Sequence, residues 1–366
     1  MPLPASVKRA VFKEVGGDLV IETVPLEMPR SGEILVKVEA CGVCHSEILA
    51  QHNVWGFGFP VVPGHEIIGR VAALGQGVEG WKVGDRIGAG WQTRLICDSF
   101  ASGGHDNTCA MCQKELYQFC QPVIINGIST NGGLVACAEC RLLTLTTDAE
   151  YCLVRAEATV RVPEDVDAAK YAPLLCAGTT SFSALKTVDI QQGDLVAVQG
   201  IGGVGHLAIQ YAKKLGARVV AISRGADKEE SIRALGADEY IDAAGDQDPG
   251  EVLKQLGYAK LVLTTAMDTA AMSPLIKGIG VRGKLMILSL PQDGNITVDS
   301  NDMITRGISM QSFNVGNCFD SQHAMDFAHS KGITCAVKTF PLDKAQEAYD
   351  AMLQGKVRYR SVLTMD

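Results

Sequence analysis

The chain has 366 residues, of which 47% are hydrophobic, and this length exceeds the roughly 100–200 residues of one domain, so two domains are expected. A formal net charge of −8, without a visible basic stripe, argues against a nucleic-acid partner. No stretch approaches the ~20 consecutive apolar residues of a membrane span and no secretory signal pattern is visible, so we expect a cytoplasmic protein with no membrane partner.

The first part of the chain has the pattern of β-structure. Apolar and polar residues alternate over residues 7–40, and the segments 67–74 and 86–89 continue the pattern around glycine-rich turns. Such alternation is typical of antiparallel strands with one buried face. We therefore expect a mostly antiparallel β domain over residues 1–172.

From about residue 168 the pattern changes to apolar runs that alternate with helical segments. Predicted strands and helices follow one another at 195–199, 206–215, 218–222, 228–235, 261–264 and 284–288. This alternation predicts βαβ units and a parallel sheet, so residues 173–312 are expected to form a doubly wound α/β domain. The tail at 313–366, with a helix near 345–354 and a strand near 360–364, is expected to rejoin the first domain.

A glycine-rich turn joins the first of these strands to the helix that follows it. Gly200 allows the tight turn, Gly202 lets the backbone approach a pyrophosphate, and Gly205 allows close packing of helix on strand. The amino terminus of the helix also favours negative charge. A dinucleotide site is therefore expected, with Gly203 and Val204 in the same loop; the alternative is an ordinary glycine-rich turn.

The end of the next predicted strand indicates which dinucleotide binds. About 20 residues beyond the glycines, an acidic residue would hold the ribose 2′-hydroxyl of NAD. Ser223 occupies that place, and Arg224 and Lys228 follow it. Because a hydroxyl and two cations suit a 2′-phosphate, NADP(H) is favoured over NAD(H). The alternative, a solvated basic face at a helix start, leaves the missing acid unexplained.

The cysteines point to metal chemistry. Twelve cysteines without a secretory signal favour reduced thiols and metal ligands over a disulfide framework. Cys44, His65 and the neighbouring Glu66 offer a thiolate, an imidazole and a carboxylate, and Cys176, at the junction of the predicted domains, supplies the third ligand that a catalytic zinc needs. The alternatives are core packing for the cysteines and a satisfied loop histidine for His65.

A second cluster has the close spacing of a structural zinc site. Asp106, Cys109, Cys112 and Cys120 follow the pattern Asp-x-x-Cys-x-x-Cys-x₇-Cys. His105 could replace Asp106 as a ligand, and a surface loop of free thiols is the alternative. An isolated zinc-finger function is not expected, because no basic helix follows the cluster.

Together these motifs resemble the zinc-dependent medium-chain alcohol dehydrogenases over almost the whole chain, and residues 223–228 look like the NADP-preferring, cinnamyl-alcohol-dehydrogenase-like branch. The resemblance implies a GroES-like catalytic domain, which binds zinc, and a Rossmann cofactor domain. It makes Cys44, His65 and Cys176 the catalytic zinc ligands. Glu47 stands where the family usually has an aspartate that orients the histidine, and its side chain is longer.

The resemblance also assigns roles around the metal and the cofactor. They are Glu66 as a carboxylate that approaches the metal, Ser46 and His52 in a proton relay, His45 and Arg360 at the cofactor phosphates, Thr180 at the nicotinamide, and Trp55, Phe57 and Trp91 in an apolar substrate pocket. The alternatives are a helix N-cap for Ser46, an exposed loop histidine for His52 and core packing for the aromatic residues. Asp106 departs from the four cysteines that usually hold the structural zinc, as it does in some members.

The chain departs from the family pattern at residues 134–148, which carry Cys137 and Cys140. No partner ligands follow this pair in the sequence. An inserted surface loop is therefore favoured over a third metal site, and a retained intron is a further explanation.

These expectations describe an enzyme that moves hydride between NADP(H) and an apolar primary alcohol or aldehyde, aromatic and allylic compounds included, with reduction as the natural direction. A same-fold alternative is NAD-dependent oxidation of a polyol or secondary alcohol. A non-catalytic cofactor-binding protein of the same fold is the third alternative, and it would be expected to have lost metal ligands. By resemblance, a homodimer or homotetramer is expected.

Overall fold

The computed structural model describes residues 2–91, 110–114, 116–119, 125–128, 148–291 and 294–365. The chain forms two compact units. The first consists of Met1–Cys176, Gly316–His329 and Thr334–Asp366, and the second of Ala177–Val315 and Ser330–Ile333. No helix in the described part is both long enough and apolar enough to cross a membrane.

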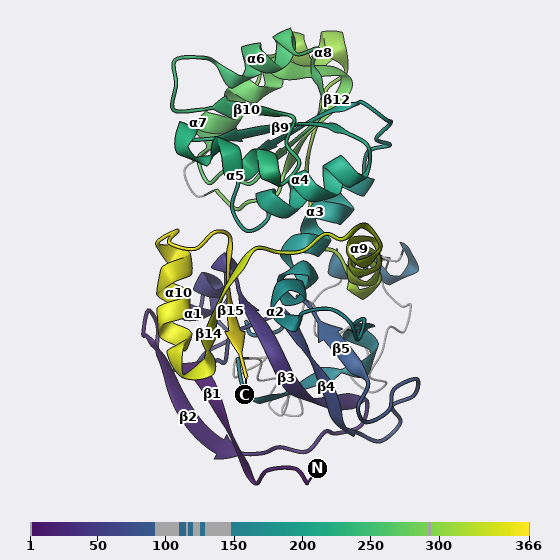
Figure 1. Ribbon diagram of the computed structural model, residues 1–366, viewed down its shortest axis with the longest axis vertical. Coiled ribbons are helices and arrows are strands. Elements are labelled where there is room, and N and C mark those ends of the chain that lie inside the picture. Colours follow the sequence, from purple (N-terminus) through teal and green to yellow (C-terminus); the bar gives the residue numbers. More distant parts are fainter. Residues whose placement is uncertain are drawn as a thin grey trace. The chain divides into compact units, whose positions relative to one another are not determined.

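The first unit is built on a seven-stranded sheet with the order β14-β15-β3-β4-β5-β7, in which β6 also pairs with β3 (Figure 1). Its strands are β3 (Glu33–Val43), β4 (Ile67–Leu74), β5 (Arg86–Ala89), β6 (Tyr151–Arg155), β7 (Thr159–Arg161), β14 (Val337–Pro341) and β15 (Arg360–Thr364). Alternate residues of β3, among them Ile34, Val36 and Val38, form a core with Ile67 and Val71 of β4. The alternating pattern in the sequence thus forms one buried sheet face.

A smaller antiparallel sheet joins β1 (Ser6–Phe12) to β2 (Leu19–Pro25). The first unit also contains the helices α1 (Ile48–Gln51), α2 (Ala168–Tyr171), α9 (Cys318–Lys331) and α10 (Ala345–Leu353). The tail pairs with the sheet, because β15 runs antiparallel to β3 with Ser361 opposite Val43, and β14 runs parallel to β15.

The second unit is a six-stranded sheet, parallel throughout, with the order β10-β9-β8-β11-β12-β13 (Figure 1). The strands are β8 (Leu195–Gln199), β9 (Arg218–Ser223), β10 (Glu239–Asp242), β11 (Ala259–Thr264), β12 (Ile279–Ile287) and β13 (Ser309–Ser312). The strand order reverses direction at β8, and right-handed crossovers on each side of that point put helices on opposite faces. The predicted α/β fold class is confirmed.

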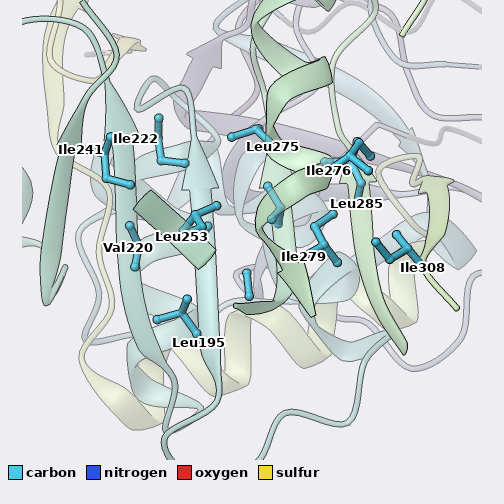
Figure 2. Close-up of a cluster of buried hydrophobic side chains, with 13 residues drawn as sticks. Leu195, Val220, Ile222, Ile241, Leu253, Leu275, Ile276, Ile279, Leu285 and Ile308 are labelled. Carbon is cyan, nitrogen blue, oxygen red and sulfur yellow. The ribbon is translucent and has the colours of Figure 1, made fainter. Parts of the chain in front are cut away.

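Helix α3 (Ala177–Lys186) precedes the first of these strands. The helices between successive strands are α4 (Gly205–Lys214), α5 (Glu229–Ala234), α6 (Pro249–Gln255), α7 (Thr269–Met272) and α8 (Ser300–Arg306). Asp248, Asp268 and Asp299 cap α6, α7 and α8 by accepting backbone N–H groups of the first turn. Figure 2 shows the core of this unit, in which Leu253 of α6 lies near Val220 and Ile222 of β9, and Leu285 of β12 lies near Ile276.

Leu253→Ala tests this core. The side chain is 0% exposed, so its loss should lower the free energy of unfolding by about 2–5 kcal/mol, measured by chemical denaturation. Ile304→Ala is the control, because Ile304 is 81% exposed and its truncation should change stability by less than about 0.5 kcal/mol. Equal effects of the two substitutions would contradict the assigned core.

Candidate metal centre and cofactor loop

The pairing of β3 with β4 brings the first two predicted ligands together. In this antiparallel pair Cys41 lies opposite Ile67. Cys44 follows the end of β3 and His65 precedes the start of β4. Because the two strands are antiparallel, both residues lie at the same end of the strand pair. Cys176 follows a short 3₁₀-helix, Ala172–Leu175, that packs against β3, β4 and β5.

The ligand atoms of Cys44, His65, Glu66 and Cys176 all lie within 4.8 Å of one another. The two sulfur atoms are 3.9 Å apart, and His65 and Glu66 are fully buried. Two thiols, an imidazole and a carboxylate are the donors that Zn²⁺ prefers. The residues therefore fit a zinc ion by number, chemistry and proximity.

The thiols of Cys44 and Cys176 are coupled by their contact. The hydrogen bond from Cys176 holds the pKa of Cys44 well below its usual value, against the effect of burial, and the same contact raises the pKa of Cys176. The Ser46 hydroxyl donates to the Cys44 sulfur at 3.1 Å and lies 3.4 Å from His65 Nε2. The contact with Cys176 therefore favours the deprotonated form of Cys44, and Ser46 lies beside the Cys44 sulfur and His65 Nε2.

One member of this group, Glu66, forms a buried ion pair with Arg360. Arg360, at the start of β15, donates to Glu66 Oε1. Burial raises the pKa of Glu66 to about 7, although Arg360 opposes that rise. The sequence-based role of Arg360 at the cofactor phosphates stays a prediction; in the structure its guanidinium is buried against Glu66.

Glu47 lies three residues after Cys44 and is fully buried. Its Oε1 accepts the backbone N–H of Cys44 at 3.0 Å, while Oε2 has no hydrogen-bond partner among the described residues. Burial, followed by the charge of Asp148, raises its pKa well above the usual value. The carboxylate thus holds the turn that follows β3.

Sequence reasoning missed Asp148, which it assigned to a surface insertion. The structure describes this last residue of the 134–148 segment and shows it fully buried. Its backbone N–H donates to Pro63 O, and its carbonyl accepts from Ala10 N–H. Burial raises its pKa to about 7. The available signal was its place directly before the buried Ala149 and the apolar strand β6.

The other predicted residues of the first unit lie at different depths. Trp91 is 9% exposed and packs edge-on against His65, with ring centroids 4.9 Å apart. Trp55 is 46% exposed, Phe57 is half-buried, and His45 and His52 are exposed. The structure therefore brings Trp91 to the metal ligands and leaves the pocket role of the others as a prediction.

The glycine-rich turn has the backbone that its residues predict. Gly200 has a φ of +84°, and a Cβ at Gly205 would lie 2.0 Å from Gly200 O. A Cβ at Gly202 would meet no atom within 4 Å, so this backbone faces open space. Val204 precedes α4 and accepts a hydrogen bond from Ser181, while Thr180 is buried in α3.

The next loop begins at Ser223, where β9 ends. Arg224 is exposed, and Lys228 Nζ donates to Arg224 O at 2.8 Å. Two residues of β10 hold Gly225 between them: Asp242 accepts its N–H at 2.8 Å and Tyr240 donates to its carbonyl at 2.7 Å. The loop that carries the predicted specificity residues is therefore fixed by its neighbouring strand.

The predicted structural zinc site lies outside the described residues. This holds for Asp106, Cys109, Cys120 and the alternative ligand His105, and for the side chain of Cys112. Residues 134–147 of the insertion, with Cys137 and Cys140, also lie outside them.

Two family models match the chain. Residues 30–164 match the alcohol dehydrogenase GroES-like domain, and residues 203–330 match the zinc-binding dehydrogenase model. These matches define a two-domain, zinc-binding oxidoreductase. The chain belongs to the zinc-dependent medium-chain alcohol dehydrogenase family, as its sequence predicts.

Similar proteins match this chain over nearly its full length. The chain is 51% identical to the alcohol dehydrogenase patD of Penicillium expansum, covering 99% of this chain and 98% of the relative. It is 49% identical to the alcohol dehydrogenase notN of Aspergillus sp. (strain MF297-2), covering 100% of both. Among solved structures, a cinnamyl alcohol dehydrogenase from Sorghum bicolor is 27% identical with a TM-score of 0.83, covering 98% of this chain and 97% of that chain.

Gly42→Ala tests the tight packing of the ligand group. A Cβ at Gly42 would lie 1.9 Å from Glu66 Oε2, and Glu66 is held by Arg360, so the carboxylate has little room to move. We expect a loss of about 1–3 kcal/mol in stability and a lower content of bound metal, measured by denaturation and elemental analysis.

Gly202→Ala is the matched control, because its Cβ would meet no atom within 4 Å. Its stability and metal content should equal those of the parent. A Gly42→Ala protein that retains both the stability and the metal content of the parent would show that the Glu66 side chain can adopt another conformation.

Proposed function

We propose that the chain is an aldehyde reductase that transfers hydride between NADP(H) and an apolar alcohol or aldehyde, aromatic and allylic compounds included. The observation that carries this proposal is the buried group of Cys44, His65, Glu66 and Cys176, whose ligand atoms lie within 4.8 Å of one another. A non-catalytic protein of this family would have no reason to keep a complete donor set at a cost of buried charge.

The first unit would hold the metal through Cys44, His65 and Cys176. Zinc bound there supplies a Lewis acid that stabilises negative charge on the substrate oxygen. Arg360 neutralises Glu66, which keeps that carboxylate buried at the edge of the ligand group. Trp91 shields His65 from water by packing against its ring.

Proton transfer is assigned to Ser46 and His52. The Ser46 hydroxyl lies between Cys44 Sγ and His65 Nε2, which puts a mobile proton beside the ligand group. His52 is exposed at the end of α1, where its imidazole is in contact with solvent. Ser46 would hold the proton at the reacting oxygen, and His52 would release it or take it from solvent.

The NADP(H) preference rests on the loop after β9. Ser223 stands where a carboxylate would select NAD, and the exposed Arg224 offers a cation to a 2′-phosphate. The carboxylate of Asp242 lies nearby, but it accepts the backbone N–H groups of Gly225 and Ala244. These bonds direct its charge toward the loop backbone.

The substrate class is supported by a relative and by Trp91. The Sorghum bicolor relative, 27% identical, is named a cinnamyl alcohol dehydrogenase. An aromatic wall beside a metal ligand favours substrates with an apolar body. Trp55 and Phe57 are included in this proposal, as are Thr180 and His45 at the cofactor.

Arg224→Ala combined with Lys228→Ala tests the cofactor assignment. The KM for NADPH should rise by at least about tenfold while the KM for NADH stays unchanged, because only NADPH loses a charge-assisted contact. Lys214→Ala, at the far end of α4, is the control and should leave both values unchanged. A parent enzyme that uses NADH as well as NADPH would favour the NAD-dependent alternative.

Cys44→Ser tests the metal assignment. The variant should lose bound zinc, measured by elemental analysis, and its kcat for aldehyde reduction should fall by at least about a hundredfold. Cys318→Ser removes a thiol that contacts Glu157 O and should leave zinc and turnover unchanged. Full turnover of the Cys44→Ser protein would refute the catalytic role of this site.

A further inference from the structure

Two buried polar groups beside the ligands have no hydrogen-bond partner among the residues that the structure describes. One is His65 Nδ1, and the other is the carboxylate of Asp148, of which neither oxygen is satisfied. Both side chains are 0% exposed. Buried polar atoms are almost always paired, so an unpaired donor and an unpaired acceptor in one site indicate an interaction that forms in the working protein.

The orientation of His65 fixes which nitrogen needs a partner. Ser46 Oγ contacts His65 Nε2 and also donates to Cys44 Sγ, so Nε2 lies on the side of the thiolates. A histidine that binds a metal through Nε2 carries its proton on Nδ1 and donates it to a carboxylate, a carbonyl or water. His65 Nδ1 is therefore a donor that requires an acceptor inside the protein.

Glu47 is the obvious acceptor from sequence, but one of its two oxygens is already in use. Glu47 Oε1 accepts the N–H of Cys44, three residues earlier, in a closed turn. This bond holds the carboxylate over the backbone of its own turn. Only Oε2 remains unpaired.

Asp148 reaches the site from a different segment, and the single S–H of its neighbour Cys41 can serve only one of its two oxygens. Its backbone N–H donates to Pro63 O at 2.9 Å, which fixes it alongside the residues that lead into His65. Burial raises the pKa of the Asp148 carboxyl, and the Cys41 thiol and, after it, the charge of His65 act in the opposite direction. The Cys41 sulfur also contacts Gly42 O, so one Asp148 oxygen remains for the imidazole.

We propose that Asp148 is the positioning residue for His65, accepting its Nδ1–H and so orienting the imidazole toward the metal. Glu47 then serves the Cys44 turn instead. This inference rests on the proposed zinc site. It gives a role to one residue of the segment in which the chain departs from its family.

Asp148→Asn, with Glu47→Gln as the matched control, tests the inference. Both substitutions remove a charge and keep the shape of the side chain. Asp148→Asn should raise the zinc Kd, measured by chelator competition, by about 10–100-fold, as expected for loss of a carboxylate partner of a ligating histidine. Glu47→Gln should change it by less than about threefold, because an amide oxygen still accepts the Cys44 N–H.

The metal-free proteins separate positioning from simple packing. The thermal midpoint of metal-free Asp148→Asn should equal or exceed that of the parent, because the substitution removes an uncompensated buried charge. A Co²⁺-loaded sample should show a shifted visible absorption spectrum for Asp148→Asn and the parent spectrum for Glu47→Gln. A residue needed only for packing would lower the midpoint and leave the affinity and the spectrum unchanged.

Two results would overturn the inference: an Asp148→Asn affinity within threefold of the parent, or a larger loss for Glu47→Gln. If Asp148→Asn does not fold, the Nδ1–H resonance of His65 in zinc-loaded Glu47→Ala, observed with ¹⁵N-labelled histidine, decides the question, because alanine has no side-chain acceptor. Its protection from exchange supports Asp148, and its loss assigns the acceptor to Glu47. A parent protein that binds no zinc at all would instead refute the proposed function.

Discussion

The antiparallel register of β3 against β4 is the constraint on which the site depends. It sets Cys44 and His65 at one end of the strand pair, and the next residue, Glu66, follows His65 into the same place. On its other side β3 pairs with β15, whose first residue is Arg360. The central strand β3 therefore carries Cys44 at its own end, has His65 and Glu66 beside it from the β4 side, and has the counter-ion of Glu66 on the β15 side. A shift of either register by one residue would turn these side chains to the opposite face.

The site contains more acidic side chains than basic ones. Three buried carboxyl groups, Glu47, Glu66 and Asp148, lie near the thiols of Cys44 and Cys176, and among the described residues the ion pair of Arg360 is with Glu66. Burying charges without partners is costly, and such groups respond by taking up protons, which explains the raised pKa values of the carboxyl groups. A bound divalent cation would relieve much of this cost, so the fold and the metal support each other.

The sequence predicts what depends on local pattern. The alternating residues of β3, the strand and helix alternation after residue 177 and the glycines at 200–205 all act within a few residues, and the fold class followed from them. It does not reveal what depends on register between distant segments. Glu66 and Arg360 are 294 positions apart, and their pairing requires β15 to lie beside β3. Asp148 was missed because a polar residue after an unusual insertion resembles a loop until the bonds to Pro63 and Ala10 bury it.

The two hydrogen bonds from β10 to Gly225 separate the backbone of this loop from its side chains. Tyr240 donates to the carbonyl of that glycine and Asp242 accepts its N–H, so both bonds act on the backbone of the loop. Neither bond uses the side chain of Arg224, so a substitution at this position changes the charge of the loop while both bonds to Gly225 remain. The backbone of the loop and the charge that it presents are therefore separable properties.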